Sequence, residues 1–440
     1  MNKRPLSTAL RPSACPGLLR IVQAKDGGIC RIKLDGGSIT SVQALAVAEA
    51  ARRFAGGVIE ATNRGNLQIR GIGDQQSALI DTLLAANLGP STAAGDDVRN
   101  LMLSPSAGID RRMLIDTRPL AAQILSTLQT HVPFHDLSAK FAVQLDGGEA
   151  LAMLDHPHDL WLSAFERDGE PLLAFGLAGC PSDVAFGAVP LAEAHALVVA
   201  VLENFLALAR PDQTRMRHLL AELTTGSFLD ALAERVNWLP ANDWQRAAAV
   251  NGCHIGTYPQ KIPGRFYVGA APPLGRLDAA MLSGAARLAD TWGDGSLRLT
   301  PWQSLLLPNI GEADAATVMA QLQALGFLVS SEQALAYLVA CTGSAGCGKG
   351  LADTKDDARQ LAALLQHHGQ QLNVHLSGCP RSCAAAHVAP VTLLAVSPGH
   401  YDLYFRAAGQ PGFGALQARN LTIEAVGARL DALPRSPLDA

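Results

Sequence analysis

The sequence is poor in charged and aromatic residues and carries little net charge of either sign. Of its 440 residues, 17% are charged and 5% are aromatic, and the formal net charge is −4. Without a basic excess, the chain lacks the electrostatic footprint of a nucleic-acid-binding protein. With 48% hydrophobic residues, it predicts a globular protein of about two to four domains, each able to bury its own core.

Long apolar segments are also absent. The N-terminal MNKRPLSTALRPSACPG has no continuous apolar h-region, and the most apolar helical candidate, residues 194–209, contains Glu203 and Asn204 and is too short to span a membrane comfortably. We therefore expect a cytoplasmic protein with no membrane partner. In that reducing compartment, the clustered members of the eight cysteines are expected to be metal ligands or redox groups rather than disulfides.

A third absence is the dinucleotide-binding fingerprint. No G-x-G-x-x-G follows a predicted strand, so nicotinamide is not expected to bind in a Rossmann domain of this chain. We expect the electrons to come from an external donor, such as a separate reductase supplied by NADH.

What the sequence does contain is an internal repeat. VIEATNRGNLQIRGI at 58–72 resembles SLRLTPWQSLLLPNI at 296–310, and each is preceded by a strand, a glycine turn and a segment with apolar residues at helical spacing. Both copies therefore predict strand, helix, strand, although two unrelated segments could share this turn chemistry by chance. The matched pairs are Thr62 with Thr300, Leu67 with Leu305, Ile69 with Leu307, and Ile72 with Ile310.

Different units follow each copy, which gives the order half-domain, domain, half-domain, domain. After the first copy come the strand-like NLMLSPSAGID, KFAVQLDGG and LLAFGLAG, and after the second come YLVACTGSAGCGKG, a helical segment, QLNVHLSGCP and VTLLAV. We expect an α+β fold. The expected boundaries are 1–88, 89–240, 241–318 and 319–440.

The segment CTGSAGCGKG at 341–350 has two incompatible interpretations. It nearly matches the phosphate loop G-x-x-x-x-G-K-[ST], but Gly350 stands where a hydroxyl must hold Mg²⁺. Read as C-x5-C, it is half of a metal site, and SGCPRSC supplies two more cysteines as C-x3-C. Four thiolates from two loops suit a [4Fe–4S] cluster, and these spacings depart from the C-x2-C pairs usual for zinc. The predicted ligands are Cys341, Cys347, Cys379 and Cys383.

At these motifs the chain resembles the siroheme-dependent nitrite and sulfite reductase family. The resemblance rests on CTGSAGCGKGLADTKDDARQLAALL and HLSGCPRSCAAAHVAPVTLL, and it extends over nearly the whole chain. It implies two ferredoxin-like half-domains that pair as one unit, two α+β domains, and a cluster whose ligand Cys383 would also bridge to siroheme iron.

The same resemblance implies three basic residues that face the tetrapyrrole. ATNRGNLQIRGI would supply Arg64, DDVRNLMLSPSAGID would supply Arg99, and KFAVQLDGG would supply Lys140, all as catalytic and ligand-binding groups. Two positions depart from the pattern, because Ala142 replaces a second lysine and Arg381 replaces an asparagine. Fewer positive groups around a small anion weaken the prediction of sulfite or nitrite reduction.

With these departures and the motifs SGCPRSC, LRLTPWQSLLL and LDGG, the chain resembles a branch of the family that works in cobalamin biosynthesis and uses the tetrapyrrole cavity for a substrate. The branch hydroxylates C20 of precorrin-3A with O₂ and forms a γ-lactone, which implies an iron–sulfur monooxygenase with precorrin-3A and O₂ as partners. Recognition of the macrocycle's carboxylates would fall to Arg64, Arg99, Lys140 and Arg298, since guanidinium pairs with carboxylate through two hydrogen bonds. The alternatives are a siroheme-dependent reductase and a non-catalytic iron–sulfur or tetrapyrrole-binding protein.

Activation of O₂ also suggests a mononuclear non-haem iron, because a cluster with four cysteinates has no open iron position. Histidine and carboxylate ligands of that kind are grouped in LDHPHDLW, which is alternatively a polar turn stiffened by proline. The principal candidates are His156 and His158, and the wider set adds Asp155, Asp159, His375 and His387.

Overall fold

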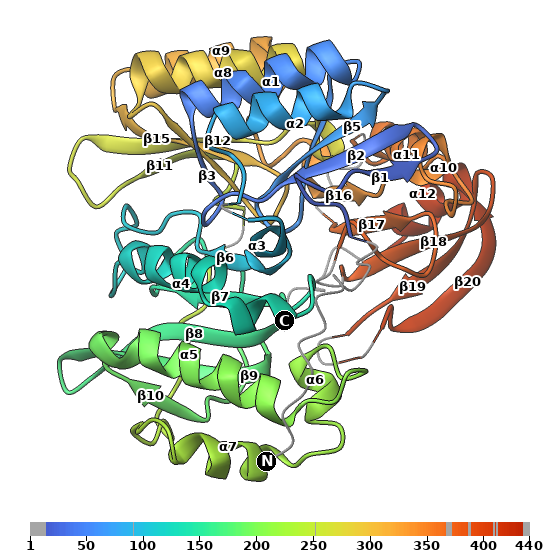
Figure 1. Cartoon of the computed structure of the whole chain (residues 1–440). Coiled ribbons are helices and arrows are strands. Elements are labelled where there is room, and N and C mark those ends of the chain that lie inside the picture. The colour runs from blue at the N-terminus through green and yellow to red at the C-terminus, as the bar shows by residue number, and fades with distance from the viewer. Residues whose placement is uncertain are drawn as a thin grey trace.

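The computed structural model describes residues 15–90, 92–250, 252–366, 372–385, 389–407, 410 and 412–433. Four five-stranded sheets and their helices form three bodies in Figure 1: the paired half-domains at the top, a middle domain below them, and a C-terminal domain to one side.

The two half-domains exchange strands. One sheet has the order β1-β2-β5-β4-β13 and the other β11-β12-β15-β14-β3, so each takes one edge strand from the other half of the chain. The exchanged pairs are antiparallel, with Leu277 opposite Ile59 and Leu297 opposite Ile39. The strands are β1 (Val22–Ala24), β2 (Gly27–Ile32), β3 (Ser38–Thr40), β4 (Val58–Ala61), β5 (Leu67–Ile72), β11 (Gly256–Pro259), β12 (Arg265–Ala270), β13 (Arg276–Asp278), β14 (Ser296–Leu299) and β15 (Leu305–Gly311).

One helical layer covers both of these sheets (Figure 1). The helix α1 (Ser41–Phe54) begins at a capping box of Thr40 and Gln43, and α8 (Ala279–Trp292) begins at Asp278, whose side chain accepts from a backbone N–H. These two helices pack against each other, with α2 (Gln76–Ala85) and α9 (Ala315–Ala324) beside them. Buried residues of both halves form one hydrophobic core, so the half-domains are a single folding unit.

The middle domain is a mixed sheet of order β10-β9-β8-β7-β6, in which β6, β7 and β8 are parallel and the pairings of β8 with β9 and of β9 with β10 are antiparallel. Among the described helices, α5 is the one long and apolar enough to cross a membrane by length and composition, and its buried side chains belong to this domain's core. The elements are α3 (Ala93–Val98), β6 (Leu101–Leu103), α4 (Arg118–Thr130), a 3₁₀ turn (Val132–Asp136), β7 (Val143–Asp146), β8 (His158–Arg167), β9 (Glu170–Gly179), β10 (Gly187–Val189), α5 (Leu191–Leu208), α6 (Met216–Leu219) and α7 (Thr225–Ala233).

The C-terminal domain repeats this topology. Its sheet has the order β16-β17-β18-β19-β20, again with two parallel pairings followed by two antiparallel ones. Its elements are β16 (Leu338–Ala340), α10 (Gly343–Gly346), α11 (Thr354–Gln366), β17 (Val374–Ser377), β18 (Val391–Ser397), β19 (His400–Phe405), β20 (Ala415–Thr422) and α12 (Ile423–Asp431), preceded by a 3₁₀ turn at Ala334–Tyr337. Another 3₁₀ turn, Pro273–Gly275, lies between β12 and β13 of the half-domains. The unit of half-domain plus domain therefore occurs twice in the chain.

Candidate metal-cluster and ligand site

The first cysteine loop begins where β16 ends. Cys341 follows the last strand residue directly, and Cys347 lies at the end of the short turn α10. Gly343 has φ +65°, and a Cβ there would lie 2.6 Å from the backbone nitrogen of Thr354, so only glycine fits without strain. Thr354 donates a hydrogen bond to the Cys341 carbonyl at 2.8 Å and lies 3.4 Å from its Sγ.

The second cysteine loop follows β17, which pairs in parallel with β16. Because the carboxyl ends of parallel strands lie at one edge of a sheet, the two loops meet there. The Gly378 N–H donates to the Sγ of Cys341 at 3.2 Å, and a Cβ on Gly378 would lie 3.2 Å from the Cα of Gly350. Glycine at 378 therefore lets the two loops approach closely.

The four predicted thiols share one electrostatic environment. Burial raises the pKa of the Cys383 thiol, and Cys379, Cys341 and Cys347 raise it further, while Arg381 lowers it. These interactions place Cys383 near the other three thiols, and bound iron would compensate the combined negative charge of the four thiolates.

The donor set suits a cluster better than a single ion. Within the described residues, no three histidine, cysteine or carboxylate side chains converge as ligands of one metal ion. A single zinc ion needs such convergence, whereas in a [4Fe–4S] cluster each thiolate binds a different iron. The phosphate-loop interpretation loses support too, because the N–H groups of Cys347 and Gly350 are already bonded to carbonyls within the loop.

Five basic side chains form a group of interacting charges, which reaches the second cysteine loop at Arg31. We call it the basic site and define it as Arg31, Lys33, Arg64, Arg99 and Arg215. Burial lowers the pKa of Arg64 to about 10, with Arg215 and Arg31 lowering it further. Burial also lowers the pKa of Arg31, and Cys15 and Cys383 oppose that shift, so Arg31 is near both Arg64 and Cys383. Burial, Arg31 and Arg99 lower the pKa of Lys33 to about 7, although Asp96 and Asp97 raise it.

Several donors of the basic site are buried without a hydrogen-bond partner among the described residues. They are the Nε of Arg31 and the Nε and Nη2 of Arg99, although Arg99 also lies 3.7 Å from Asp35 and 3.9 Å from Asp96 as an ion pair. Buried guanidinium groups with unused donors are costly unless an anion completes them. A ligand that carries several carboxylates fits this requirement.

Lys140 and Arg298 have different surroundings from Arg64. Lys140 is exposed on the turn before β7. Arg298 is buried and donates to the carbonyls of Pro105 and Ala107 at 3.1 and 2.7 Å, which ties β14 to the middle domain. It lines a separate cavity of about 520 Å³ between β14 and α4, together with Arg118. Roles for Lys140 and Arg298 as ligand-binding groups stay predictions.

The structure gives no support to a mononuclear iron at the histidine-rich turn. Asp159 accepts hydrogen bonds from Arg215 at 2.9 Å and from the N–H groups of Ala142 and Met216, so its carboxylate is already occupied. His158 is buried and donates to the His156 carbonyl at 2.7 Å, and burial and Arg64 lower its pKa to about 3. Of the wider candidates, Asp155 is exposed, His375 is buried in β17, and His387 lies outside the described residues.

The basic site contains three residues that the sequence analysis missed: Arg31, Lys33 and Arg215. Arg31 and Lys33 alternate with buried apolar residues in and just after β2, so both point to one face of the strand. Two basic side chains on one face of an otherwise buried strand were a usable signal. Arg215 had no such sequence signal, because its position in the site depends on its ion pair with Asp159, 56 residues away in sequence.

The fold and the site together define a class. The model described as nitrite/sulfite reductase ferredoxin-like half domain matches residues 21–87 and 258–325, and the one described as nitrite and sulphite reductase 4Fe-4S domain matches residues 94–239. A solved structure of Mycobacterium tuberculosis NirA protein superposes with a TM-score of 0.77 at 21% identity, over 92% of this chain and 79% of that one, and shows the same fold. This chain belongs to the nitrite and sulfite reductase family.

Two relatives differ in how much of the chain they match. A chloroplastic ferredoxin–nitrite reductase of Zea mays is 32% identical over 392 residues, which cover 82% of this chain and 68% of the relative. A precorrin-3B synthase of a Sinorhizobium species is 28% identical over 435 residues, covering 98% of this chain and 91% of the relative. The chain spans about two thirds of the length of the plant reductases it matches. These relatives are oxidoreductases, and together with the second family model they support an iron–sulfur cluster here.

Proposed function

We propose that this chain is a precorrin-3B synthase, an iron–sulfur monooxygenase that hydroxylates C20 of precorrin-3A with O₂ and closes a γ-lactone. The observation that carries the proposal is the length of the match, because the Sinorhizobium enzyme aligns with 98% of this chain and with 91% of its own length. The plant reductase leaves about a third of its own length unmatched. In the reaction, one oxygen atom of O₂ enters the product and the other leaves as water, with two electrons from an external donor.

The basic site supports binding of a macrocycle with several carboxylates. Arg31, which interacts with Cys383, and its neighbour Arg64 would orient carboxylates on the side of the cysteine loops, while Arg99, which neighbours Lys33, would hold others. Guanidinium groups suit this task because each can donate two hydrogen bonds to one carboxylate. The neutral His158 beside Arg64 adds no competing charge.

Cys341, Cys347, Cys379 and Cys383 would hold a [4Fe–4S] cluster, which when bound transfers electrons one at a time. Burial and the Gly378 N–H on the Cys341 sulfur would both influence its reduction potential. The chain's own part is to hold the thiolates at one edge of the sheet and the substrate carboxylates on the basic site.

The test combines anaerobic purification with an isotope assay. Iron, acid-labile sulfide and acid-extractable tetrapyrrole are measured first, and the protein is then given precorrin-3A, a reductant and ¹⁸O₂. We expect iron and sulfide without siroheme, and a product that contains one ¹⁸O atom. A product that forms equally well without O₂ would refute the proposal.

The second candidate is a siroheme-dependent nitrite or sulfite reductase, favoured by the 32% identity with the maize enzyme. It predicts siroheme in a one-to-one ratio to the chain and reduction of nitrite or sulfite. Ala142 counts against it, because alanine supplies no positive charge where the family pattern has a second lysine. The residue is buried, and its N–H donates to Asp159. Binding of precorrin-3A without turnover, and without siroheme, would instead indicate a non-catalytic tetrapyrrole-binding protein.

A further inference from the structure

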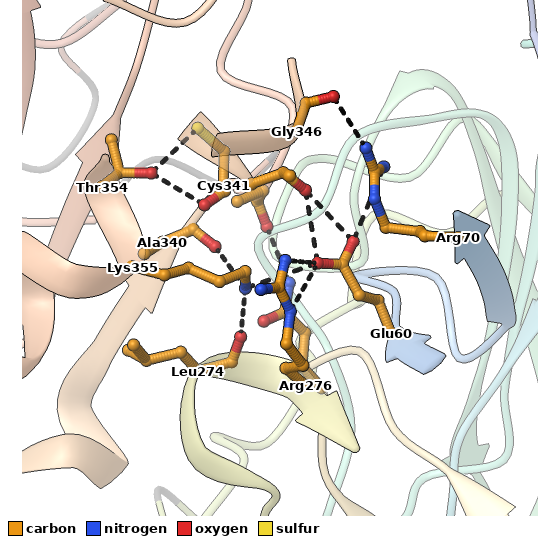
Figure 2. A network of polar contacts seen from close by, with 12 residues as sticks. Glu60, Arg70, Leu274, Arg276, Ala340, Cys341, Gly346, Thr354 and Lys355 are labelled. Carbon is orange, nitrogen blue, oxygen red and sulfur yellow. Dashed lines mark hydrogen bonds and ion pairs between the residues drawn. The ribbon is translucent and has the colours of Figure 1, made fainter. Parts of the chain in front are cut away.

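A buried carboxylate joins the paired half-domains to the first cysteine loop. Glu60 in β4 is 8% exposed, yet four side chains from both halves of the chain surround its oxygens (Figure 2). Arg276 donates to it at 2.8 Å and Thr342 at 3.2 Å, and the cationic groups of Lys355 and Arg70 each lie 3.8 Å away. Thr342 is the residue directly after Cys341.

The same network reaches the far end of the loop. Arg70 forms two hydrogen bonds of 2.9 Å with Asp26 and donates to the carbonyl of Gly346 at 3.2 Å, one residue before Cys347. Between these points, Lys25 donates to the Ser344 carbonyl at 2.7 Å. The first half-domain thus holds the loop at three places.

Lys355, in α11 of the C-terminal domain, also belongs to the network. Its ammonium donates to the carbonyl of Ala340, just before Cys341, at 3.2 Å and to the carbonyl of Leu274 at 2.6 Å (Figure 2). Its neighbour Thr354 contacts both the carbonyl and the sulfur of Cys341. The residues on both sides of Cys341 are therefore bonded to this network.

The network has a surplus of positive charge. Apart from the exposed Lys25, its cations are Arg70, Arg276 and Lys355, and its anions are Glu60 and Asp26, which leaves one net positive charge. Burial raises the pKa of Glu60, but Lys355, Arg70 and Arg276 outweigh burial and lower it overall, so Glu60 is ionised. A buried ionic network is weak evidence for added stability, so its place behind Cys341 calls for another explanation.

The repeated domain offers an internal reference. Arg118 at the start of α4 corresponds to Lys355 near the start of α11, since DTR and DTK open the two helices. The Arg118 side chain is 49% exposed and pairs with Asp116 on its own helix terminus, whereas Lys355 is 5% exposed. The buried cation thus occurs in the copy that carries the four cysteines.

We propose that the Glu60 network positions the loop of Cys341 and Cys347 and raises the reduction potential of the iron–sulfur group held there. The inference rests on the cluster in the proposed function. Reduction adds a negative charge to the cluster, so a nearby surplus of positive charge favours the reduced state.

The test uses two substitutions in the full chain that change the net charge of the network in opposite directions. Glu60→Gln removes an anion and Lys355→Gln removes a cation, and a potentiometric titration followed by EPR measures the midpoint potential of each. We expect Glu60→Gln to raise the potential and Lys355→Gln to lower it, each by about tenfold in the reduction equilibrium, or about 59 mV for one electron. Arg276→Lys, which keeps the charge, is expected to leave the potential near that of the wild type.

A second readout tests the positioning role without iron. Hydrogen exchange of the amides at 342–350 in the iron-free chain is expected to be at least tenfold faster in Glu60→Gln than in the wild type, because the Thr342 and Arg276 contacts weaken. Glu222→Gln in the middle domain is the matched control, since that exposed carboxylate pairs with Arg210, and it should change neither readout.

The outcomes separate the proposals. Shifts in the same direction, or none, would overturn the effect on the potential, and unchanged exchange would overturn the positioning role. A wild-type chain that binds no iron after anaerobic reconstitution refutes the cluster itself, and the exchange result then decides the positioning role alone. Should Glu60→Gln fail to fold, Arg276→Gln at a side chain 30% exposed replaces it, and it must lower the potential.

Discussion

The middle and C-terminal domains have the same sheet topology, but different residue types follow the corresponding strands at the same edge of the sheet. The residue after β16 is Cys341, and the residue after β6 is Ser104. Six positions further on, the C-terminal domain has Cys347 and the middle domain has Asp110. Two positions after β17 stands Cys379, and two after β7 stands Gly148. The middle domain thus lacks thiols at the three corresponding positions.

Carboxylates and one arginine occupy that edge of the middle domain. Asp110 accepts from Ser106 at 2.8 Å and from the Ala150 N–H at 3.1 Å. Asp146 accepts two hydrogen bonds from Arg246, at 2.6 and 3.0 Å. These polar bonds connect the loops of the middle domain directly to one another, whereas the corresponding loops of the C-terminal domain carry the four cysteines.

The comparison shows that the fold alone does not specify a cluster. The family model named for a 4Fe-4S domain matches residues 94–239, which is the copy without the four cysteines. That match follows the shared topology, and the metal chemistry depends on a few loop residues. The half-domains differ in a similar way, because Trp302 stands in the turn that corresponds to the one with Arg64, and it stacks on His254 with ring centroids 5.2 Å apart.

The largest expected effect removes one cluster ligand. Cys379→Ser should abolish iron binding and activity, because a serine oxygen is a poor ligand for iron in a sulfide cluster. Cys180→Ser in the middle domain is the matched control and should keep full iron content by colorimetric assay. Full activity in an iron-free Cys379→Ser protein would contradict any electron-transfer role of the cluster.

A second prediction concerns Arg246, which pairs with Asp146 at this edge of the middle domain. Arg246→Ala should lower the free energy of unfolding by about 3 to 5 kcal/mol, because it leaves the buried carboxylate of Asp146 without its partner. Urea titration followed by tryptophan fluorescence measures the change. Arg210→Ala removes an exposed ion pair in the same domain and should have no measurable effect. Equal effects of the two variants would show that Arg246 is not essential to the edge.

Arg64 tests whether the first half-domain holds the ligand. Arg64→Ala should weaken binding of precorrin-3A by about 1.5 to 3 kcal/mol, the typical value of a charged hydrogen bond. Fluorescence titration under anaerobic conditions measures it, with Arg265→Ala, on an exposed position of the second half-domain, as the control. An unchanged dissociation constant for Arg64→Ala would place the ligand elsewhere.

The smallest effect is a change in pH dependence. Burial and the neighbouring Asp146 raise the pKa of Glu149 well above its ordinary 4.5. Its neutral form therefore contributes stability that is fully present below pH 4.5 and is lost as the pH rises through the raised pKa. Glu149→Gln should keep the stability at high pH and match the wild type at low pH, as measured by thermal unfolding across pH. Exposed Glu166→Gln should leave the profile unchanged, and an identical profile for Glu149→Gln would refute the shift.

Much of the fold could be predicted from the sequence because its signals are local. The segments 58–72 and 296–310 were predicted as the strand after each helix, and each forms two antiparallel strands, β4–β5 and β14–β15, while the family comparison confirms both half-domains. The cysteines were found from their spacing. The exchange of β3 and β13 was not predicted, because each is only three residues long and its partner lies in the other half of the chain.

The charged networks could not be predicted for a related reason. Glu60 lies 216 residues from Arg276 and 282 from Thr342, so no periodic pattern connects them. A glutamate within VIEA reads as the exposed face of a strand, and only the tertiary fold shows that it is buried. Ion pairs between distant segments become visible when the sheets are placed against one another.

The exchanged strands also set an order for synthesis. The strand β4 ends at Ala61, and its edge partner β13 ends at Asp278, so translation separates them by about 10 to 40 seconds at about 5 to 20 residues per second. During that interval β4 keeps an open edge, which is a template for pairing with other chains. The middle domain, whose five strands all lie between residues 101 and 189, can complete its sheet first. The nascent chain is therefore most vulnerable to aggregation until the ribosome has delivered β13.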